Sequence, residues 1–420
     1  MDGPNGASTI NPQPSTGAEG GRGAAAAARR ALRALADGVP PHDRAARWLT
    51  VGQAEILAEF EADLDAVAAG DFRSLLILGD PGAGKSQLLV SLRQLGVERG
   101  FATAHFAQDP QSRVGFNRPD QIYRRLVETL RLPAGGADSD PLRAVMEAWA
   151  DASLPKLVGT GRSAAIAYRL SAAGLLPRET QGIPLRTRMA LVGFLMATEQ
   201  QNDDAQREFL NVVRGVGLTN TELIQVARSI GYEPGHVGWT PTGHDARYHF
   251  GQLRTLLFIL RTLGYPGMVV LVDEMIALVE LGARSRDKAY RVLDALFFNE
   301  YQYQGLYAVF AYVPAFFNRL QADRDRLGAE FVARWRDLRG DRMREVAPLT
   351  AAEMLEVFGR LARLHGVARG WAAWERVAAD GQRLVALCRQ RQSSTRDLVR
   401  SGVTLLEKRY AEQGAEGAGR

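Results

Sequence analysis

The chain has 420 residues, of which 46% are hydrophobic and 24% are charged. That balance is typical of a folded globular protein with two or three structural units, since domains average ~150 residues. No apolar run approaches the ~20 residues of a membrane-spanning helix, and no signal-peptide pattern is seen. The one cysteine, Cys388, excludes an intrachain disulfide and a zinc ribbon, and its apolar flanks predict a buried thiol. We therefore expect a cytoplasmic protein without membrane contact.

The formal net charge is +5, and the basic residues are almost all arginine, with lysine only at Lys85, Lys156, Lys288 and Lys408. The 47 acidic residues are dispersed among the arginines. The overall charge therefore permits a polyanionic partner without indicating one.

The N-terminal segment, residues 1–27, is rich in Gly, Pro, Ser, Asn and Ala, and Ile10 is its one branched aliphatic residue. Such a segment buries too little apolar surface to offset its ordering entropy, so we expect a disordered tail, and a second tail at 413–420. A helix is predicted at 28–36, and another at 55–68, where apolar residues recur at helical spacing.

Five short apolar runs predict strands. The first, Ser74–Leu78, has the continuous apolar character of a parallel strand that is buried on both faces. The other runs are 100–107, 268–272, 306–311 and 344–347. Because these runs alternate with helical patterns, the sequence predicts an α/β fold with a parallel sheet.

Residues 140–235 are predicted to be almost wholly helical, as an insertion between the second and third strands. Near the C-terminus, Thr350–Glu353 has the pattern of a capping box and Ser394–Asp397 resembles a second helix start. We predict a core in two parts, 28–135 and 246–348, interrupted by a helical insertion at 136–245 and followed by an all-helical domain at 349–412.

Residues 79–86 match the pattern GxxxxGK[ST] in full, and they lie between the first predicted strand and a predicted helix. Glycines let the backbone wrap a phosphate, and the amides of the helix N-terminus point at it. Lys85 would reach the β- and γ-phosphates, and Ser86 would ligate Mg²⁺. The alternative is a glycine turn that binds nothing. The predicted ATP-binding residues are Gly79, Asp80, Pro81, Gly82, Ala83, Gly84, Lys85, Ser86 and Gln87.

The apolar run at 269–272 ends in two carboxylates, Asp273 and Glu274. Asp273 would hold the Mg²⁺, and Glu274 would orient and deprotonate the attacking water. This pair favours hydrolysis over nucleotide storage. A guanine-reading [NT]KxD motif, a metal-binding histidine pattern and a D/E-x-K nuclease motif are all absent from the sequence.

Together these motifs resemble the ASCE division of P-loop ATPases, and more closely the AAA+ proteins, which carry a helical lid. Shorter segments, in their order along the chain, resemble the BREX-type ATP-binding proteins (BrxC/BrxD-like). They are Ala31–Leu35 with Gly38–Pro40, Val51–Gln53, Phe60–Gly70, Gly100–Thr103, Gln121–Leu126, Gly264–Gly267 and Pro314–Phe317. The resemblance covers most of 28–410 and is thin across 140–235. It implies a P-loop ATPase with 349–412 as its lid, acting as a homo-oligomer with other proteins of a bacterial anti-phage system and with double-stranded DNA.

The sequence departs from these relatives at two places. Ala311-Tyr312-Val313 stands where AAA+ proteins carry a polar sensor 1, and Tyr312 is either a hydroxyl donor to the nucleotide or a core or interface tyrosine. Gln53 stands where relatives tend to carry arginine. Both departures are compatible with slow or conditional hydrolysis.

The resemblance also implies catalytic arginines. Arg334 is the first choice for an arginine finger that acts on a neighbouring subunit, with Arg336 and Arg339 as further choices. Arg396 matches the position of sensor 2. For each finger residue the alternative is a solvated helix face of mixed charge.

A basic run near the C-terminus is the best sequence candidate for contact with DNA phosphates, with a solvated helix as the alternative. It comprises Arg383, Arg389, Arg391, Arg396 and Arg400, opposed only by Asp397. Three functions stay open: a DNA-linked ATPase, an ATP-dependent switch that recruits partners through 140–235, and a loader resembling origin-recognition ATPases. A loader would need a winged helix, which the sequence does not indicate, and a small-molecule kinase would not need so large a helical block.

Overall fold

The computed structural model describes residues 18–41, 44–108, 115–133, 140–157, 163–177, 183–233, 240–338 and 342–418. The chain divides into two compact units, one of Met1–Gly52 with Pro348–Arg420 and one of Gln53–Ala347. The sequence analysis grouped the N-terminal helices with the core, whereas the structure groups them with the C-terminal helices. The reason is that the apolar face of the first helix packs against helices of the C-terminal segment.

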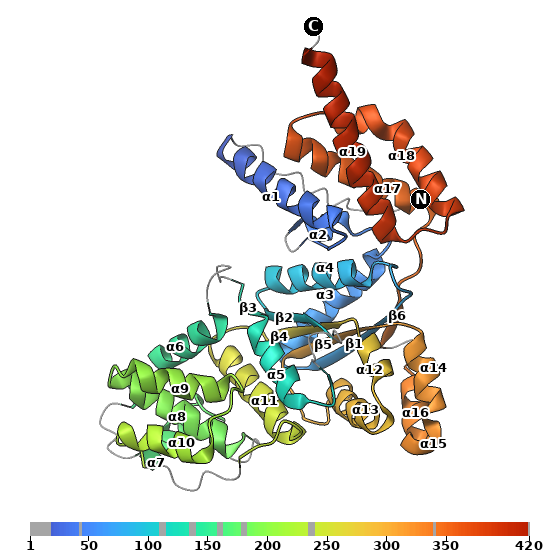
Figure 1. Ribbon diagram of the computed structural model, residues 1–420. Helices are drawn as coiled ribbons and strands as arrows, with labels where there is room; N and C mark the ends of the chain where they lie inside the picture. The colour runs from blue at the N-terminus through green and yellow to red at the C-terminus, as the bar shows by residue number, and fades with distance from the viewer. Residues whose placement is uncertain are drawn as a thin grey trace, which may run out of the picture. The chain divides into compact units, whose positions relative to one another are not determined.

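The second unit is built around a mixed six-stranded sheet (Figure 1). Its strand order is β3-β2-β4-β5-β1-β6, and every neighbouring pair is parallel except β2 with β3. The strands are β1 (Phe72–Leu78), β2 (Ala102–Ala107), β3 (Leu130–Arg131), β4 (Met268–Asp273), β5 (Leu306–Tyr312) and β6 (Met343–Glu345). All five predicted strands are present. The two-residue antiparallel β3 was not predicted, because so short a strand has no detectable periodicity.

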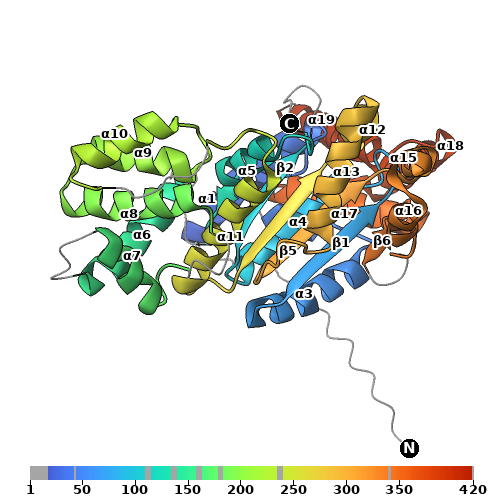
Figure 2. The same cartoon turned by 90° about the horizontal axis from the view of Figure 1, so that it is seen from below.

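Helices cover both faces of this sheet (Figures 1 and 2). On one face lie α3 (Ala54–Ala69) and α4 (Lys85–Glu98), and on the other lie α5 (Pro119–Glu128), α11 (Ala246–Thr262) and α13 (Ala283–Phe297). Alternate residues of β4 and β5 enter the two apolar layers, so every position of both strands is buried. This two-sided burial explains why the strands read as continuous apolar runs.

A helical block lies between β3 and β4 in the sequence, beside the sheet in Figure 2. Its helices are α6 (Pro141–Ser153), α7 (Ser163–Ala172), α8 (Leu185–Glu199), α9 (Asp203–Val213) and α10 (Asn220–Ser229), with a short 3-10 turn at Leu154–Lys156. Helix α8 is apolar nearly all round and is buried along most of its length. The described part of this region is thus mostly helical, as the sequence predicts.

The first unit is all-helical and consists of α1 (Ala18–Ala36), α2 (Arg44–Leu49), α17 (Ala351–Arg369), α18 (Ala373–Gln390) and α19 (Thr395–Ala418). The capping box at Thr350 is present, with the Glu353 side chain accepting from the Thr350 backbone amide at 2.7 Å. Cys388 is buried, as predicted. No helix in the described part of the chain is both long and apolar enough to cross a bilayer.

The structure differs from the predicted tails. Helix α1 begins at Ala18 rather than at residue 28, and α19 continues to Ala418. The extension of α1 is rich in alanine, the residue with the highest helix propensity, and each extension continues a helix whose other end is packed. Residues 1–17, 419 and 420 lie outside the described residues.

A close backbone approach at the start of β4 leads to a first prediction. A Cβ on Gly267 would lie 2.3 Å from the carbonyl oxygen of Gly305, and backbone cannot swing aside as a side chain can. We expect Gly267→Ala to lower the free energy of unfolding by about 1–3 kcal/mol. The matched control is Gly217→Ala, whose Cβ would meet no atom within 4 Å. Urea unfolding of both variants is the measurement, and equal midpoints would contradict the packing described.

Candidate nucleotide-binding site

A glycine-rich loop joins β1 to α4 at the C-terminal edge of the sheet. Gly82 and Gly84 have φ of +82° and +105°, a left-handed backbone that glycine adopts at little cost. Helix α4 begins directly after Gly84, at Lys85. The loop therefore presents a helix N-terminus whose first amides have no intrahelical partner. This is the backbone arrangement that favours a bound anion.

The Lys85 side chain folds back over this loop. Its Nζ donates to the carbonyl oxygens of Gly79 at 2.7 Å and Asp80 at 2.9 Å. Burial lowers the pKa of Lys85, while the negative charges of Asp273 and Asp80 oppose that shift. An ammonium has three N–H donors, so one remains for a phosphate oxygen beside the loop.

The two carboxylates predicted to accompany the loop follow β4 and differ in their surroundings. Asp273 is 6% exposed, and its Oδ1 accepts from the Glu274 backbone amide at 2.8 Å. Glu274 is exposed, and its φ of +54° is a strained conformation for a residue other than glycine. Such strain costs about 1–3 kcal/mol and recurs at functional sites, where the surrounding structure imposes it.

The residue types at the loop and after β4 fit a magnesium ion. Ser86 offers a hydroxyl in the first turn of α4, and Asp273 offers a carboxylate that is electrostatically coupled to Lys85. Oxygen donors from one or two side chains, completed by water and phosphate, are the ligands that Mg²⁺ prefers.

Tyr312, at the end of β5, is a core residue. It is 1% exposed, and its ring lies 4.2 Å from that of Phe316, centroid to centroid. Burial raises the pKa of its hydroxyl well above the ordinary value. Val309 and Ala311 belong to the apolar layer that includes α4, whereas Tyr312 belongs to the opposite layer. Of the two interpretations left open for Tyr312, the core tyrosine is the one the structure supports.

The predicted catalytic arginines occupy three different environments. Arg334, on α16 (Ala329–Arg336), pairs with Asp294 at 3.0 Å and stacks 3.5 Å over the centroid of Phe298. Arg336 is exposed on the same helix, and Arg339 lies outside the described residues. Arg396 is exposed on α19 and thus belongs to the other unit. Gln53 stands at the N-cap of α3 without a side-chain capping bond.

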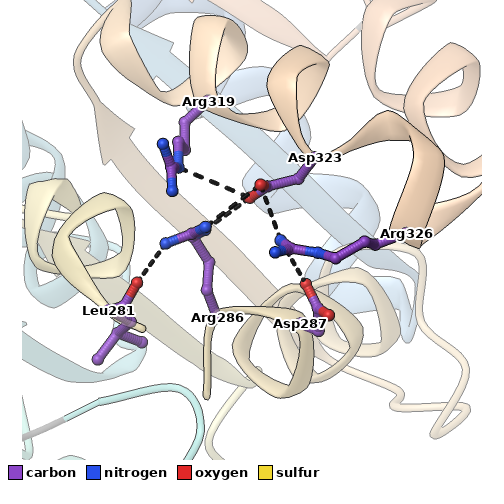
Figure 3. A network of polar contacts seen from close by, with 6 residues as sticks. All are labelled: Leu281, Arg286, Asp287, Arg319, Asp323 and Arg326. Carbon is purple, nitrogen blue, oxygen red and sulfur yellow. Dashed lines mark hydrogen bonds and ion pairs between the residues drawn. The ribbon is translucent and has the colours of Figure 1, made fainter. Parts of the chain in front are cut away.

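Sequence analysis missed a buried ion-pair network on the side of the sheet that carries α13 (Figure 3). Arg286 is 2% exposed and pairs with Asp323 at 2.6 Å. Arg326 reaches the same carboxylate at 2.7 Å and Arg319 lies 3.8 Å from it, so three arginines share one aspartate. Arg326 also pairs with Asp287 at 3.0 Å. No local pattern could have indicated the Arg286–Asp323 pair, because the two residues are 37 residues apart.

The network ties together the segments that follow β4 and β5. Arg286 also donates to the carbonyl oxygen of Leu281, which ends α12 (Ile276–Glu280), the short helix after Glu274 (Figure 3). Asp323 lies between α14 (Ala315–Ala322) and α15 (Arg324–Leu327), which follow β5. The buried Arg286–Asp323 pair thus connects the segment that follows Asp273 and Glu274 to the segment that follows β5.

Comparison with known proteins identifies the family. The family model described as BREX system ATP-binding protein BrxC/D matches residues 24–404. No curated protein and no solved structure matches the chain. The chain therefore belongs to the BREX system ATP-binding proteins BrxC/D, as the sequence resemblance indicated.

The network leads to a second prediction. Asp323→Asn would leave Arg286 buried without a compensating charge, so we expect the free energy of unfolding to fall by about 3 kcal/mol, the lower end for a broken buried pair. The matched control is Asp325→Asn, two residues along on the exposed surface of α15. Urea unfolding measures both, and a loss of similar size in the two variants would contradict the assigned role of Asp323.

Proposed function

Since the chain belongs to a family of ATP-binding proteins of a phage-defence system, we propose that it hydrolyses ATP with Mg²⁺ on a P-loop core of the AAA+ type. The observation that carries this proposal is the position of the Lys85 ammonium, held over the glycine loop and coupled to Asp273. A cation, free helix amides and carboxylates are the groups that phosphoryl transfer needs.

In this proposal each group has one task. Residues 79–87 bind the phosphates through backbone amides, and Lys85 donates to the β- and γ-phosphate oxygens. Ser86 and Asp273 hold the Mg²⁺, which neutralises charge on the phosphates. Glu274 orients the attacking water and accepts its proton, from an exposed position directly after β4.

The remaining proposals concern assembly. We assign Arg334 as the arginine finger and Arg396 as the sensor 2 residue, both acting in a homo-oligomer. The Arg334 side chain is 44% exposed, so a neighbouring subunit's phosphate could compete with Asp294 for its guanidinium. Other proteins of the defence system and double-stranded DNA are the proposed partners, and the cytoplasm is the proposed compartment.

A second function is favoured by a specific observation, the burial of Tyr312. With its hydroxyl in the apolar layer opposite α4, the end of β5 offers the γ-phosphate no side-chain donor from this position. A chain that binds ATP and hydrolyses it slowly would act as a switch, recruiting partners through the helical block at 140–235.

A third prediction separates chemistry from binding. We expect Glu274→Gln to lower ATP turnover at least about 100-fold, the lower end for loss of a general base, while ATP binding persists. Lys85→Ala should lose binding as well. The matched control is Glu280→Gln, an exposed glutamate at the other end of α12. Turnover is measured by phosphate release and binding by titration of a fluorescent ATP analogue. Binding without turnover in the unaltered chain would favour the switch.

A fourth prediction concerns the finger. If Arg334 acts across a subunit boundary, Arg334→Ala mixed with Glu274→Gln should give more turnover than the weighted mean of the two variants. The reason is that an Arg334→Ala subunit keeps its own Glu274 and receives the Arg334 of a Glu274→Gln neighbour. Arg336→Ala, on the same helix as Arg334, is the control and should keep the turnover of the unaltered chain. A mixture no more active than the weighted mean would remove Arg334 from this role.

A further inference from the structure

The net positive charge of the protein resides in one of its two units. The unit of Met1–Gly52 with Pro348–Arg420 has 18 basic and 12 acidic residues, a net charge of +6. The unit of Gln53–Ala347 has 34 basic and 35 acidic residues, a net charge of −1. A genome-wide preference for arginine would act on both units alike, so it does not explain an excess confined to one.

Four arginines of the charged unit gather where α18 ends and α19 begins. Arg389 and Arg391 close α18, and Arg396 and Arg400 are one helical turn apart at the start of α19. All four are exposed, and none makes an ion pair with a carboxylate of the described residues. We call these four residues the turn arginines.

The backbone of α1 supports two of the turn arginines. A Cβ on Gly38, just beyond the end of α1, would lie 3.3 Å from the aliphatic carbons of both Arg396 and Arg400. Their stems therefore lie together over this glycine. Aliphatic stems packed on backbone leave the guanidinium groups to water or to a ligand.

One acidic residue beside this cluster offsets part of its charge. Asp397 is electrostatically coupled to Arg400 and Arg396, and it caps α19 by accepting from the backbone amide and the hydroxyl of Ser394 at 3.1 and 2.7 Å. Elsewhere in the same unit arginines are paired: Arg409 with Asp380 at 2.8 Å and Arg369 with Glu407 at 2.6 Å. With one aspartate beside four arginines the cluster keeps an excess of positive charge, and an anionic partner relieves the remaining repulsion.

We propose that three of the turn arginines, Arg389, Arg391 and Arg400, form a docking surface for the phosphate backbone of nucleic acid, while Arg396 keeps the sensor 2 role proposed for it. A guanidinium group can bind two oxygens of one phosphate at once. Each phosphate that an arginine neutralises releases a counterion condensed on the nucleic acid, which favours binding. The described segment 386–403, which carries these arginines, contains no aromatic side chain for stacking on bases, so it reads the backbone of a duplex with little sequence preference. This inference rests on the DNA link of the proposed function and assigns that link to a unit other than the one with the P-loop.

The test is binding of the full chain to a short fluorescein-labelled DNA duplex, followed by anisotropy over a range of salt concentrations. The variant is Arg389→Gln with Arg391→Gln, which leaves Arg396 and the P-loop intact. We expect affinity at low salt to fall by about tenfold, and the slope of log affinity against log salt to shrink by about 2, since each lost phosphate contact removes about one unit.

The matched control removes the same charge from the far ends of the same two helices. It is Arg376→Gln with Lys408→Gln, two exposed cations near the start of α18 and well along α19. This control should keep the affinity and the salt slope of the unaltered chain. Equal losses in the two double variants would overturn the assignment, because they would reflect net charge alone.

Further arms of the experiment identify the partner. Single-stranded DNA, duplex RNA and polyglutamate, an acidic polypeptide, are used as competitors of the labelled duplex. Displacement by polyglutamate with no binding to any nucleic acid would overturn the proposal in favour of an acidic protein. ATP turnover without nucleic acid, measured on the same preparations, reports the proposed ATPase separately. The proposed docking surface can thus be disproved while the proposed ATPase is supported, and the ATPase can be disproved while the docking surface is supported.

Discussion

The position of β5 is the constraint on which the nucleotide-binding site depends. Strands β1 and β4 do not pair with each other, and each pairs in parallel with β5. In that register Leu78 lies opposite Tyr312 and Val272 lies opposite Phe310, so the glycine loop and the two carboxylates leave the sheet at one edge. A shift of one residue would turn every β5 side chain to the other face. Because β5 is buried along its whole length, its two apolar layers prevent that shift.

Sequence patterns predicted the parts of the fold that local chemistry determines. Strands buried along most of their length appear as largely apolar runs, and β1, β2, β4 and β5 were found in this way, whereas β6 is a short, half-buried to exposed edge strand. The glycine loop was predicted from its GxxxxGK[ST] pattern, and in the structure Gly82 and Gly84 have the positive φ that glycine adopts at little cost. The pattern did not predict β3, which is too short for periodicity, or the membership of α1 in the C-terminal unit, because packing between distant segments leaves no local signal.

The environment of a side chain could be predicted only where its own helix or strand determines it, and not where a distant segment supplies the neighbours. The order of residues along β5 left the direction of Tyr312 open, and the alternation of buried layers decided it. Likewise, a charged helix face around Arg334 was expected, but its partners Asp294 and Phe298 come from another helix 36 to 40 residues earlier. The pair of Arg286 and Asp323 likewise joins two segments that are distant in the sequence. Ion pairs between distant segments are a consequence of the fold, so the sequence alone does not reveal them.

The distribution of charge separates two tasks between the units. The unit with the glycine loop is nearly neutral, so in the proposed function it holds a polyphosphate through a local arrangement of amides and Lys85 rather than through a broad positive field. The helical unit has an excess of positive charge, with exposed arginines that outnumber the carboxylates beside them where α18 ends and α19 begins. The electrostatic field of many exposed arginines attracts any polyanion and is screened by salt. Backbone amides at fixed positions instead select a phosphate that fits their geometry. Binding at the two places should therefore respond differently to ionic strength, strongly at the turn arginines and weakly at the loop.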